Sequence, residues 1–398
     1  MKQFNKEITM NSIPLSPVNY IFTGTGSQPI TFAFSYLNKL DSDALRNSLN
    51  ETLNHFTILQ SQLNKSSKTD YKFQINEDGL NFDVIESNLV FEESSKIEQY
   101  ITPVNSVESE PLTKITLTQT PKGSILAVSI SHALIDGFSY FHFLSSWARI
   151  CRGDRILPPF LERNILSSSF NPNSKKITSE EIYTNCGLFL GNKRSRLQTG
   201  QSNHEVIFIS GETIRSYLEE ANHEHNVSFT ENDVITALLW KKYIPMWHEE
   251  HDNPMTFMTC PFDFRRIMTD FPKNYFGCAL CFATAAIDFN GLLKASLGDL
   301  AILIRSAVNK IKDDFILKSL NTLENLRLQN GLAAIEKVHL RHPHHGMIVT
   351  NLTRLPIRDL DFGFGAPINF KAYAEVTSSA AILPAENGVE IFVVHPPK

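Results

Sequence analysis

The chain has 398 residues, of which 42% are apolar and 20% are charged, proportions that are ordinary for a soluble globular protein. Its 37 basic and 42 acidic residues give a net charge of −5, without a block of like charge. This balance argues against nucleic acid and against an anionic membrane surface as partners. The length exceeds what one hydrophobic core usually supports, so we expect two domains.

The cysteines are few and odd in number: Cys151, Cys186, Cys260, Cys278 and Cys281. Only Cys278 and Cys281 are close, with the CxxC spacing, and they lie in the apolar run CALCFATAAI. A zinc site would need a second pair of ligands, and a thioredoxin-like redox site would need a βα turn at this point. We therefore expect buried, inert thiols in a reducing compartment and no metal.

The N-terminal stretch MKQFNKEITMNSIPL lacks the apolar segment of a secretory signal. No apolar run approaches the ~18 residues that a membrane-spanning helix needs. The expectation is a soluble, cytoplasmic protein without a membrane partner.

Four elements are expected in the N-terminal half. Residues 30–37 alternate in hydrophobicity with the two-residue period of a strand. Asp41 offers an N-cap, and leucines at helical spacing predict an amphipathic helix over 42–55. The short apolar run at 123–132 favours a buried strand, and the long aromatic-rich stretch at 137–150 predicts a helix.

The composition changes between residues 164 and 204, where Ser, Asn, Gly and Lys cluster and apolar periodicity fades. We place an interdomain crossover loop at 166–205, between an N-terminal domain at 1–165 and a C-terminal domain at 206–398. Strands and helices interleave on both sides of this loop, which predicts two α/β domains.

The C-terminal half is expected to begin with a strand at 204–210. A helix follows over 229–243, because Thr230 and Asp233 form a capping box at its start. Further elements are predicted by apolar patterning: strands at 255–260, 347–351 and 389–395, and one long helical stretch around 294–329.

The stretch SHALIDGFSYFHF, residues 131–143, runs a buried strand into a histidine and then into an Asp-Gly turn. One interpretation is purely structural, with His132 packed and Asp136 capping the following helix. The other is that His132 projects from the strand end into a cleft, where its neutral ring can accept a proton near pH 7. On this second interpretation the backbone turns through Asp136-Gly137, where Gly137 can take a conformation that a residue with a Cβ cannot adopt cheaply.

A second pattern, TNLTRLPIRDLDFGFGAP, occupies residues 350–367. Its two glycines and flanking phenylalanines indicate a rigid loop with close backbone approach. The residues of its core are Asp361, Phe362, Gly363, Phe364 and Gly365. A kinase interpretation of Asp-Phe-Gly fails, because the companion catalytic and glycine-rich motifs are missing.

Together, HxxxDG in the middle of the chain and DFGFG near its end resemble the BAHD acyltransferases of the chloramphenicol-acetyltransferase-like superfamily, which carry HxxxDG and DFGWG in that order. IPLSPVNYIF and LRNSLNETLNHFTILQSQL look like the family's first strand and helix, and DFRRIMTDFPKNYFGC looks like its mid-C-terminal stretch. TRLPIRDLDFGFG is similar to the hydroxycinnamoyltransferase members. The resemblance covers nearly the whole chain.

The resemblance implies a fold of two chloramphenicol-acetyltransferase-like α/β domains, each a mixed β-sheet with flanking helices, and an active-site channel at the domain interface. Acyl-CoA would enter as co-substrate and a small-molecule alcohol or amine as acceptor. No permanently bound cofactor and no metal are implied. The family also implies a monomeric enzyme of secondary metabolism.

The resemblance also assigns roles to residues. His132 would be the general base, and Thr350 matches a threonine that presents its hydroxyl to the acceptor or the oxyanion. Asp136 and Gly137 would be structural, with Asp136 paired to Arg265. The DFGFG loop would support the CoA channel without taking part in the chemistry, away from His132 and with its phenylalanines buried.

Some positions depart from the family pattern. Phe364 replaces the tryptophan of DFGWG, Leu352 replaces a tryptophan common in the hydroxycinnamoyl branch, and Cys278 replaces an asparagine. Gln60-Ser61-Gln62 stands where many members have Ala-Gly-Arg. These differences concern the substrate and leave the chemistry of His132 intact.

Two alternatives belong to other classes. A condensation-domain-like enzyme would use carrier-protein-bound thioesters, but such domains usually have a second histidine where this chain has Ser131. A non-catalytic relative kept for protein interactions would have no need of His132.

Three further patterns are weaker. FTGTGSQP, residues 22–29, lacks the third glycine and the lysine of a nucleotide loop and is expected to be a turn. HPHHG, residues 342–346, lacks a clear fourth ligand for zinc and is expected to hold exposed loop histidines. His142, on the helix after the turn, is expected to be a surface or packed residue.

Overall fold

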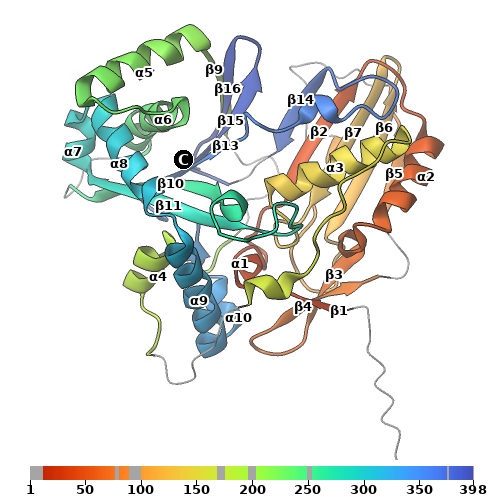
Figure 1. Cartoon of the computed structure of the whole chain (residues 1–398), viewed down its shortest axis with the longest axis horizontal. Helices are drawn as coiled ribbons and strands as arrows, with labels where there is room; N and C mark the ends of the chain where they lie inside the picture. Colours follow the sequence, from red (N-terminus) through yellow and green to blue (C-terminus); the bar gives the residue numbers. More distant parts are fainter. Residues whose placement is uncertain are drawn as a thin grey trace, which may run out of the picture. The chain divides into compact units, whose positions relative to one another are not determined.

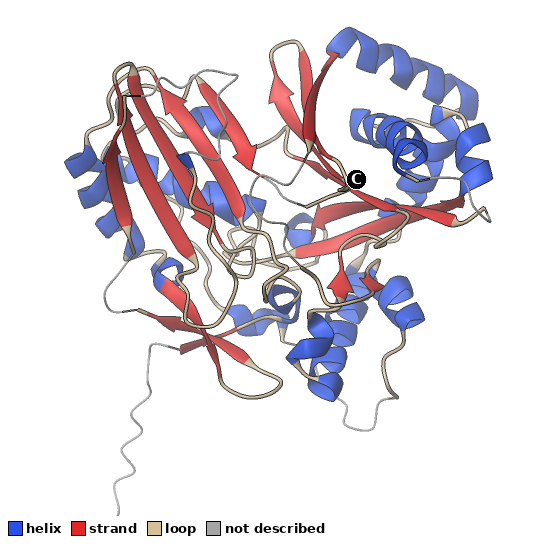
Figure 2. Ribbon diagram, turned by 180° about the vertical axis from the view of Figure 1, so that it is seen from behind, coloured by secondary structure: helices blue, strands red, loops and turns tan. Residues whose placement is uncertain are grey.

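The computed structural model describes residues 12–76, 80–88, 100–167, 175–195, 203–248, 253–373 and 376–397. The chain divides into two compact units. Unit 1 comprises Met1–Ser167, Phe276–Cys278 and Arg358–Tyr373, and unit 2 comprises Ser168–Tyr275, Ala279–Ile357 and Ala374–Lys398. Figure 1 colours the elements along the sequence, and Figure 2 separates helices from strands by colour.

Unit 1 contains a five-stranded and a three-stranded sheet, with strand orders β14-β2-β7-β6-β5 and β1-β4-β3. The strands are β1 (Ser12–Pro14), β2 (Ile30–Tyr36), β3 (Ser61–Lys65), β4 (Tyr71–Ile75), β5 (Phe82–Glu86), β6 (Thr113–Thr120), β7 (Gly123–Ile130) and β14 (Asn369–Tyr373). Only β5 and β6 run parallel in the larger sheet, whose other pairs are antiparallel. Every residue of β7 is buried, which explains its continuous apolar sequence.

Three helices accompany these sheets: α1 (Pro17–Tyr20), α2 (Ser42–Leu53) and α3 (Gly137–Cys151). Helix α3 packs on the larger sheet through Tyr140, whose ring lies 5.5 Å from that of Phe32 on β2. Its Trp147 is fully buried and donates its indole N–H to the backbone oxygen of Leu45 on α2. The two helices are thereby fixed to each other and to the sheet.

Unit 2 is built on a six-stranded sheet of order β11-β10-β13-β15-β16-β9. These strands are β9 (His204–Ser210), β10 (Met255–Asp263), β11 (Leu280–Asp288), β13 (Gly346–Asn351), β15 (Ser379–Ala385) and β16 (Gly388–Val394). The central pairs β10–β13 and β13–β15 are parallel, and the outer pairs are antiparallel. A separate pair joins β8 (Phe189–Leu190) to β12 (Val338–His339).

The helices of unit 2 are α4 (Ser179–Cys186), α5 (Gly211–His225), α6 (Glu231–Trp247), α7 (Phe289–Lys294), α8 (Leu297–Asn309), α9 (Asp313–Asn330) and α10 (Leu332–Ile335). Helix α6 covers one face of the six-stranded sheet. Asn232 on α6 accepts a hydrogen bond from Asn351 on β13, and Tyr243 bonds to Glu205 on β9. The opposite face of β13 and β9 therefore points away from α6, because side chains alternate along a strand.

Most elements predicted from the sequence are confirmed within one or two residues at each end. The predicted helix over 42–55 is α2, with Asp41 as its N-cap, and the capping box of Thr230 and Asp233 opens α6. The single helical stretch around 294–329 is wrong. It contains two helices, α8 and α9, because α8 ends at Asn309 and Lys312 takes an extended backbone, with φ −140° and ψ 174°, before α9 begins.

The division into units differs from the predicted domains at two places. The predicted crossover at 166–205 contains α4 and β8, which belong to unit 2, while residues 168–174 and 196–202 lie outside the described part. The DFGFG loop, expected in the C-terminal domain, belongs to unit 1. The reason is that β14, just after the loop, pairs with β2, and Phe362 packs against Tyr36 and Trp147.

No helix in the described part of the chain is long and apolar enough to cross a membrane.

The turn between β6 and β7 offers a test of this packing. Gly123 has φ +127°, and a Cβ there would lie 1.9 Å from the backbone oxygen of Tyr36. Gly123→Ala should lower the free energy of unfolding by more than ~2 kcal/mol, because the backbone must move. In the control, Gly153→Ala, φ is +78° and nothing lies within 4 Å. That variant should lose only ~1 kcal/mol. Equal losses in denaturant titrations would contradict the clash.

Candidate active site

The HxxxDG motif forms the connection between β7 and α3 in unit 1. The strand ends at Ile130, residues 132–134 form a turn, and α3 begins at Gly137. His132 therefore leaves the sheet at its end, and its side chain is half-buried. This is the placement that the sequence predicted.

Two buried polar side chains hold the backbone of this turn. The Asn19 amide donates to the backbone oxygen of Ala133 over 2.8 Å, and the Arg163 guanidinium donates to that of Leu134 over 2.9 Å. Arg163 also donates to the Asn19 side-chain oxygen over 3.3 Å and lies over the ring of Phe73. Because Asn19 and Arg163 are 0% and 3% exposed, these bonds are shielded from water.

Two serines fix the ends of the turn. The Ser131 hydroxyl lies 2.6 Å from that of Ser106 and accepts the backbone N–H of Ala133. On the α3 side, the Ser139 hydroxyl donates to the backbone oxygen of Gly277 over 2.9 Å and accepts its N–H over 3.0 Å. The chain segment 276–278 is thereby held against the start of α3.

The His132 ring is fixed by stacking on Phe22. The two ring centroids are 3.9 Å apart and the planes differ by 6°. Burial lowers the pKa of His132, while the backbone oxygens of His132 and Ile135 and the carboxylate of Asp136 oppose that shift. The ring is therefore neutral near pH 7 and can accept a proton.

Asp136 is the N-cap of α3. Its carboxylate accepts the backbone N–H of Ser139 over 3.0 Å, its own N–H donates to Gly277, and the residue is 1% exposed. A structural role for Asp136 is thus supported, as both interpretations of the sequence expected.

The prediction that position 137 needs glycine for an unusual backbone conformation is wrong. Gly137 is the first residue of α3, its φ is not positive, and a Cβ there would meet nothing within 4 Å. The first turn of a helix needs no left-handed residue, so the backbone does not require glycine here. The absence of a side chain instead leaves open space five residues after His132.

Arg265 belongs to unit 2 and is 1% exposed. It forms an ion pair with Asp263 over 2.9 Å and donates to the backbone oxygen of Tyr275 over 3.0 Å. Asp136 lies in unit 1, so the pairing of Asp136 with Arg265 stays a prediction.

Thr350 lies near the end of β13 and is half-buried. Its neighbour Asn351 is bonded to α6, so the Thr350 side chain points to the face of the sheet that α6 does not cover. A side chain on that face can meet a ligand. The role that the family resemblance gives to Thr350 stays a prediction.

The DFGFG loop is closed by its own aspartate. Asp361 accepts the backbone N–H groups of Gly363 and Gly365 over 2.8 and 2.9 Å, and both glycines have positive φ. The expectation that Asp361 holds the turn is confirmed, and no bond joins it to His132 in the described part of the chain. The prediction that both phenylalanines are buried is correct for Phe362, which is 1% exposed, and wrong for Phe364, which is only half-buried.

The loop is also joined to its surroundings in unit 1. Arg152, just after α3, donates to the backbone oxygen of Asp361, and Asn38 donates to that of Phe364 over 2.7 Å. These contacts explain the loop's position. Its support of a CoA channel stays a prediction.

The cysteines and histidines set aside by the sequence occupy packed positions. Cys186, Cys260, Cys278 and Cys281 are buried. His142 donates its Nε2–H to the Leu157 backbone oxygen over 2.9 Å and contacts the ring of Phe56. FTGTGSQP is a turn between α1 and β2 and supplies Phe22.

The HPHHG histidines differ from the expectation of exposed loop residues. His342 is half-buried and stacks on Phe257 with ring centroids 4.8 Å apart. Burial, followed by the neighbouring His345, lowers the pKa of His342 to about 4. Only His344 of the three is exposed.

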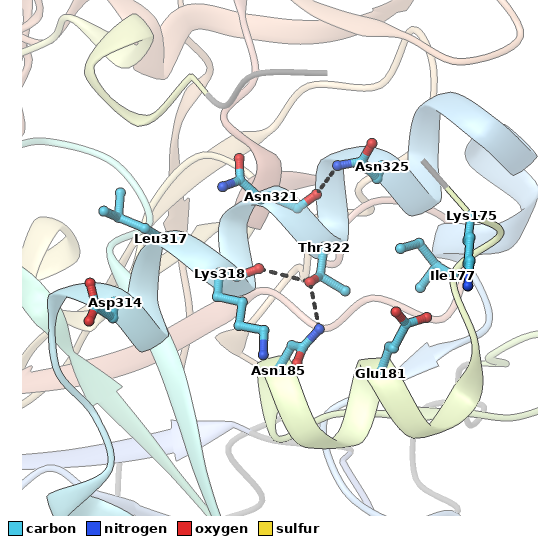
Figure 3. Close-up of a pocket in the computed structure, with 10 residues that line it drawn as sticks. All are labelled: Lys175, Ile177, Glu181, Asn185, Asp314, Leu317, Lys318, Asn321, Thr322 and Asn325. Carbon is cyan, nitrogen blue, oxygen red and sulfur yellow. Dashed lines mark hydrogen bonds between the residues drawn. The ribbon is translucent and has the colours of Figure 1, made fainter. Parts of the chain in front are cut away.

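Two other features of unit 2 could hold ligands. Among the described residues, Glu224, His225 and Asp299 form one group with metal-binding atoms within 4.8 Å of one another. A pocket of about 410 Å³ lies between α4 and α9. Figure 3 shows its floor, where Asn185 and the Lys318 backbone bond to Thr322. None of the predicted site residues belongs to the group or to the pocket.

The sequence did not single out the residues that support His132. Asn19 and Arg163 lie 113 and 31 positions away from His132 in the sequence, and only their being polar residues at buried positions could have suggested them. Phe22 is the first residue of FTGTGSQP, whose glycine spacing drew attention to nucleotide binding and not to His132. Its ring could not be paired with His132 without the fold.

Each unit contains a mixed β-sheet with flanking helices, as the sequence predicted, and unit 1 holds His132 at a strand end. The crystal structure of F. graminearum TRI101 complexed with Coenzyme A and Deoxynivalenol has this fold, with a TM-score of 0.77 and 16% identity. The match covers 96% of this chain and 95% of that one. The predicted two-domain fold class is confirmed.

A model of the Transferase family matches residues 5–398, so the chain belongs to the Transferase family, and the resemblance to the BAHD acyltransferases is confirmed. The hydroxycinnamoyl-CoA:5-hydroxyanthranilate N-hydroxycinnamoyltransferase HHT1 of Avena sativa is 29% identical over 66% of this chain. That match spans only 60% of the oat protein's length. The shikimate O-hydroxycinnamoyltransferase of Nicotiana tabacum is 22% identical over 89% of this chain and 81% of its own length.

The closure of the DFGFG loop can be tested with Asp361→Ala. Loss of the acceptor for two backbone N–H groups should lower the free energy of unfolding by ~1–2 kcal/mol. Asp359→Ala, two residues earlier and exposed, is the control and should change it little. Thermal and denaturant unfolding measure the difference. If both variants unfold like the parent, Asp361 does not hold the loop.

Proposed function

We propose that this protein is an acyl-CoA-dependent acyltransferase that moves an acyl group from a CoA thioester to a hydroxyl or amine acceptor. The observation that carries the proposal is His132, whose neutral ring is fixed at the end of β7 by stacking on Phe22. Family membership and the names of the relatives support the same chemistry.

In the proposed first step, His132 takes the proton of the acceptor as its oxygen or nitrogen attacks the thioester carbonyl carbon. Because the Nδ1 atom of His132 is buried, Nε2 is the nitrogen proposed to take the proton. The stacked Phe22 ring limits rotation of the imidazole and so keeps the base aimed in one direction.

In the second step, the tetrahedral intermediate collapses. The carbon–sulfur bond breaks, and the CoA thiolate receives the proton that His132 holds, which gives the new ester or amide and free CoA. The negative charge on the carbonyl oxygen needs hydrogen-bond donors in the intermediate. We propose the Thr350 hydroxyl as one donor, since its side chain points away from α6.

The other predicted residues keep supporting roles in the proposal. Asp136 caps α3 and favours the protonated form of His132, which stabilises the imidazolium formed in the first step. Arg265 would pair with Asp136. The DFGFG loop would support the CoA channel, and no part of the mechanism requires a metal.

The names of the relatives suggest the substrates. Hydroxycinnamoyl-CoA appears in the name of the oat protein, and the solved TRI101 structure is a complex with Coenzyme A. We propose acyl-CoA as a co-substrate and a small molecule as acceptor, in a monomeric cytoplasmic enzyme of secondary metabolism.

The proposed base is tested by His132→Ala. Turnover should fall ~10²–10⁴-fold, because a positioned general base is lost, while the circular dichroism spectrum is retained. The assay follows thiol release from acyl-CoAs with hydroxyl and amine acceptors. His223→Ala removes an exposed histidine from α5 and is the control. Retention of more than about a tenth of turnover by His132→Ala would reject the assignment.

The pH dependence offers a second test. The Asp136 carboxylate raises the pKa of His132 against the effect of burial, so Asp136→Asn should lower that pKa further. Since the base works when neutral, the acid limb of kcat/KM should move to lower pH. Asn also caps helices, which keeps α3 intact.

Asp314→Asn, an exposed aspartate on α9, is the matched control and should leave the limb in place. If the acid limb of the kcat/KM profile also stays at the same pH in Asp136→Asn, then His132 does not set the pH dependence.

A further inference from the structure

The face of the six-stranded sheet that carries Thr350 is organised in rows. Thr350 on β13 pairs with Ala381 on β15, which pairs with Phe392 on β16, and Phe392 pairs with Val206 on β9. Paired residues on neighbouring strands point to the same face. The four side chains therefore form one row, on the face opposite α6.

The outer part of this row is apolar and exposed. Val206 is 53% exposed, and Phe208, two residues further along β9 on the same face, is 56% exposed. Phe392 is half-buried. Ala381 has no atoms beyond its Cβ, so its side chain projects less from the sheet than the side chains of Thr350 and Phe392 on either side.

The spacing of strands gives the row a length scale. Neighbouring strands lie about 4.8 Å apart, so Phe392 is about 10 Å and Val206 about 14 Å from Thr350 along the sheet. An apolar group bound on this surface would therefore begin within one small-molecule length of the Thr350 hydroxyl.

The charge on this face is also informative. Glu390 is exposed and pairs with Phe208, so its carboxylate lies on the same face, beside the apolar side chains. Of the residues described on this face of β13, β15, β16 and β9, none is Lys or Arg. One histidine, His204 on β9, is exposed on the same face, and its ring centroid lies 5.0 Å from that of Phe392. A ligand carboxylate would be repelled here and would find no guanidinium or ammonium partner.

We propose that Val206, Phe208 and Phe392 form a surface that binds the apolar, uncharged part of the acceptor, and that Glu390 selects against acceptors with a carboxylate at that end. This inference rests on the proposed function and adds a substrate class to it. It sets this chain apart from relatives named for acidic acceptors such as shikimate and 5-hydroxyanthranilate.

Self-association through β9 is the competing explanation, because β9 is an edge strand of the sheet. Two exposed apolar side chains supply little of the roughly 800 Å² per partner that a stable interface buries. The continuity of the row with Thr350 favours a substrate instead.

The first experiment needs no turnover. A neutral naphthalene dye such as prodan should bind the wild type, and Phe208→Ala should weaken that binding ~5–10-fold through lost apolar burial. Leu293→Ala, which removes a 46% exposed apolar side chain from α7, is the control and should bind like the wild type. The anionic dye anilinonaphthalene sulfonate should bind more tightly to Glu390→Gln than to the wild type.

The second experiment uses matched substrates that differ by one carboxylate. Methyl shikimate and shikimate test the acceptor, and butyryl-CoA and succinyl-CoA test the donor. The wild type should prefer methyl shikimate to shikimate by about 10-fold in kcat/KM, and Glu390→Gln should narrow that ratio. A response of the acyl-CoA pair alone would overturn the assignment of the surface to the acceptor. Glu219→Gln, exposed on α5, is the charge control.

Failure of the proposed function and failure of this inference give different experimental results. If the wild type releases no CoA with any donor, the proposed function fails, and dye binding still decides whether the surface binds apolar ligands. Turnover with unchanged ratios in Glu390→Gln, or equal dye affinity in Phe208→Ala and the wild type, would overturn the inference. So would sedimentation that shows a wild-type dimer and a Phe208→Ala monomer.

Discussion

The structure around His132 depends on hydrogen bonds that buried side chains make to the backbone of one short turn. Asn19 and Arg163 bond to the turn at Ala133 and Leu134, which have no sheet partners for their carbonyl groups. A buried backbone carbonyl without a donor would cost as much as a lost hydrogen bond. The fold meets that requirement with groups from distant parts of the chain, so the turn and unit 1 stabilise each other.

The same constraint explains why unit 1 is assembled from three pieces of chain. Segment 276–278 bonds to Ser139 and Asp136 at the start of α3, and the DFGFG loop with β14 completes the sheet edge beside β2. Each piece satisfies polar groups that the first 167 residues leave open. Both motifs that carry the family resemblance therefore lie in one unit, although more than 220 positions separate them.

The sequence predicted what is local and missed what is distant. The strand before His132, the caps at Asp41 and Thr230 and the Asp361 turn follow from neighbouring residues, and all were predicted. The break before α9 and the membership of DFGFG in unit 1 depend on tertiary packing, which no local pattern encodes. Gly137 was misjudged for a related reason. Its sequence context suggested a backbone need, whereas the structure gives it ordinary helical geometry and open space.

Opposing local forces act on His132, the proposed base. Burial lowers its pKa, and the two backbone oxygens and the Asp136 carboxylate offset only part of that shift, so the pKa stays below its usual value. The carboxylate cannot collapse onto the ring, because it is already committed to the N–H of Ser139 as the cap of α3. Helix capping thus holds a negative charge at a fixed position near the histidine. The charge raises the affinity of the ring for a proton, as the proposed role of His132 as a general base requires.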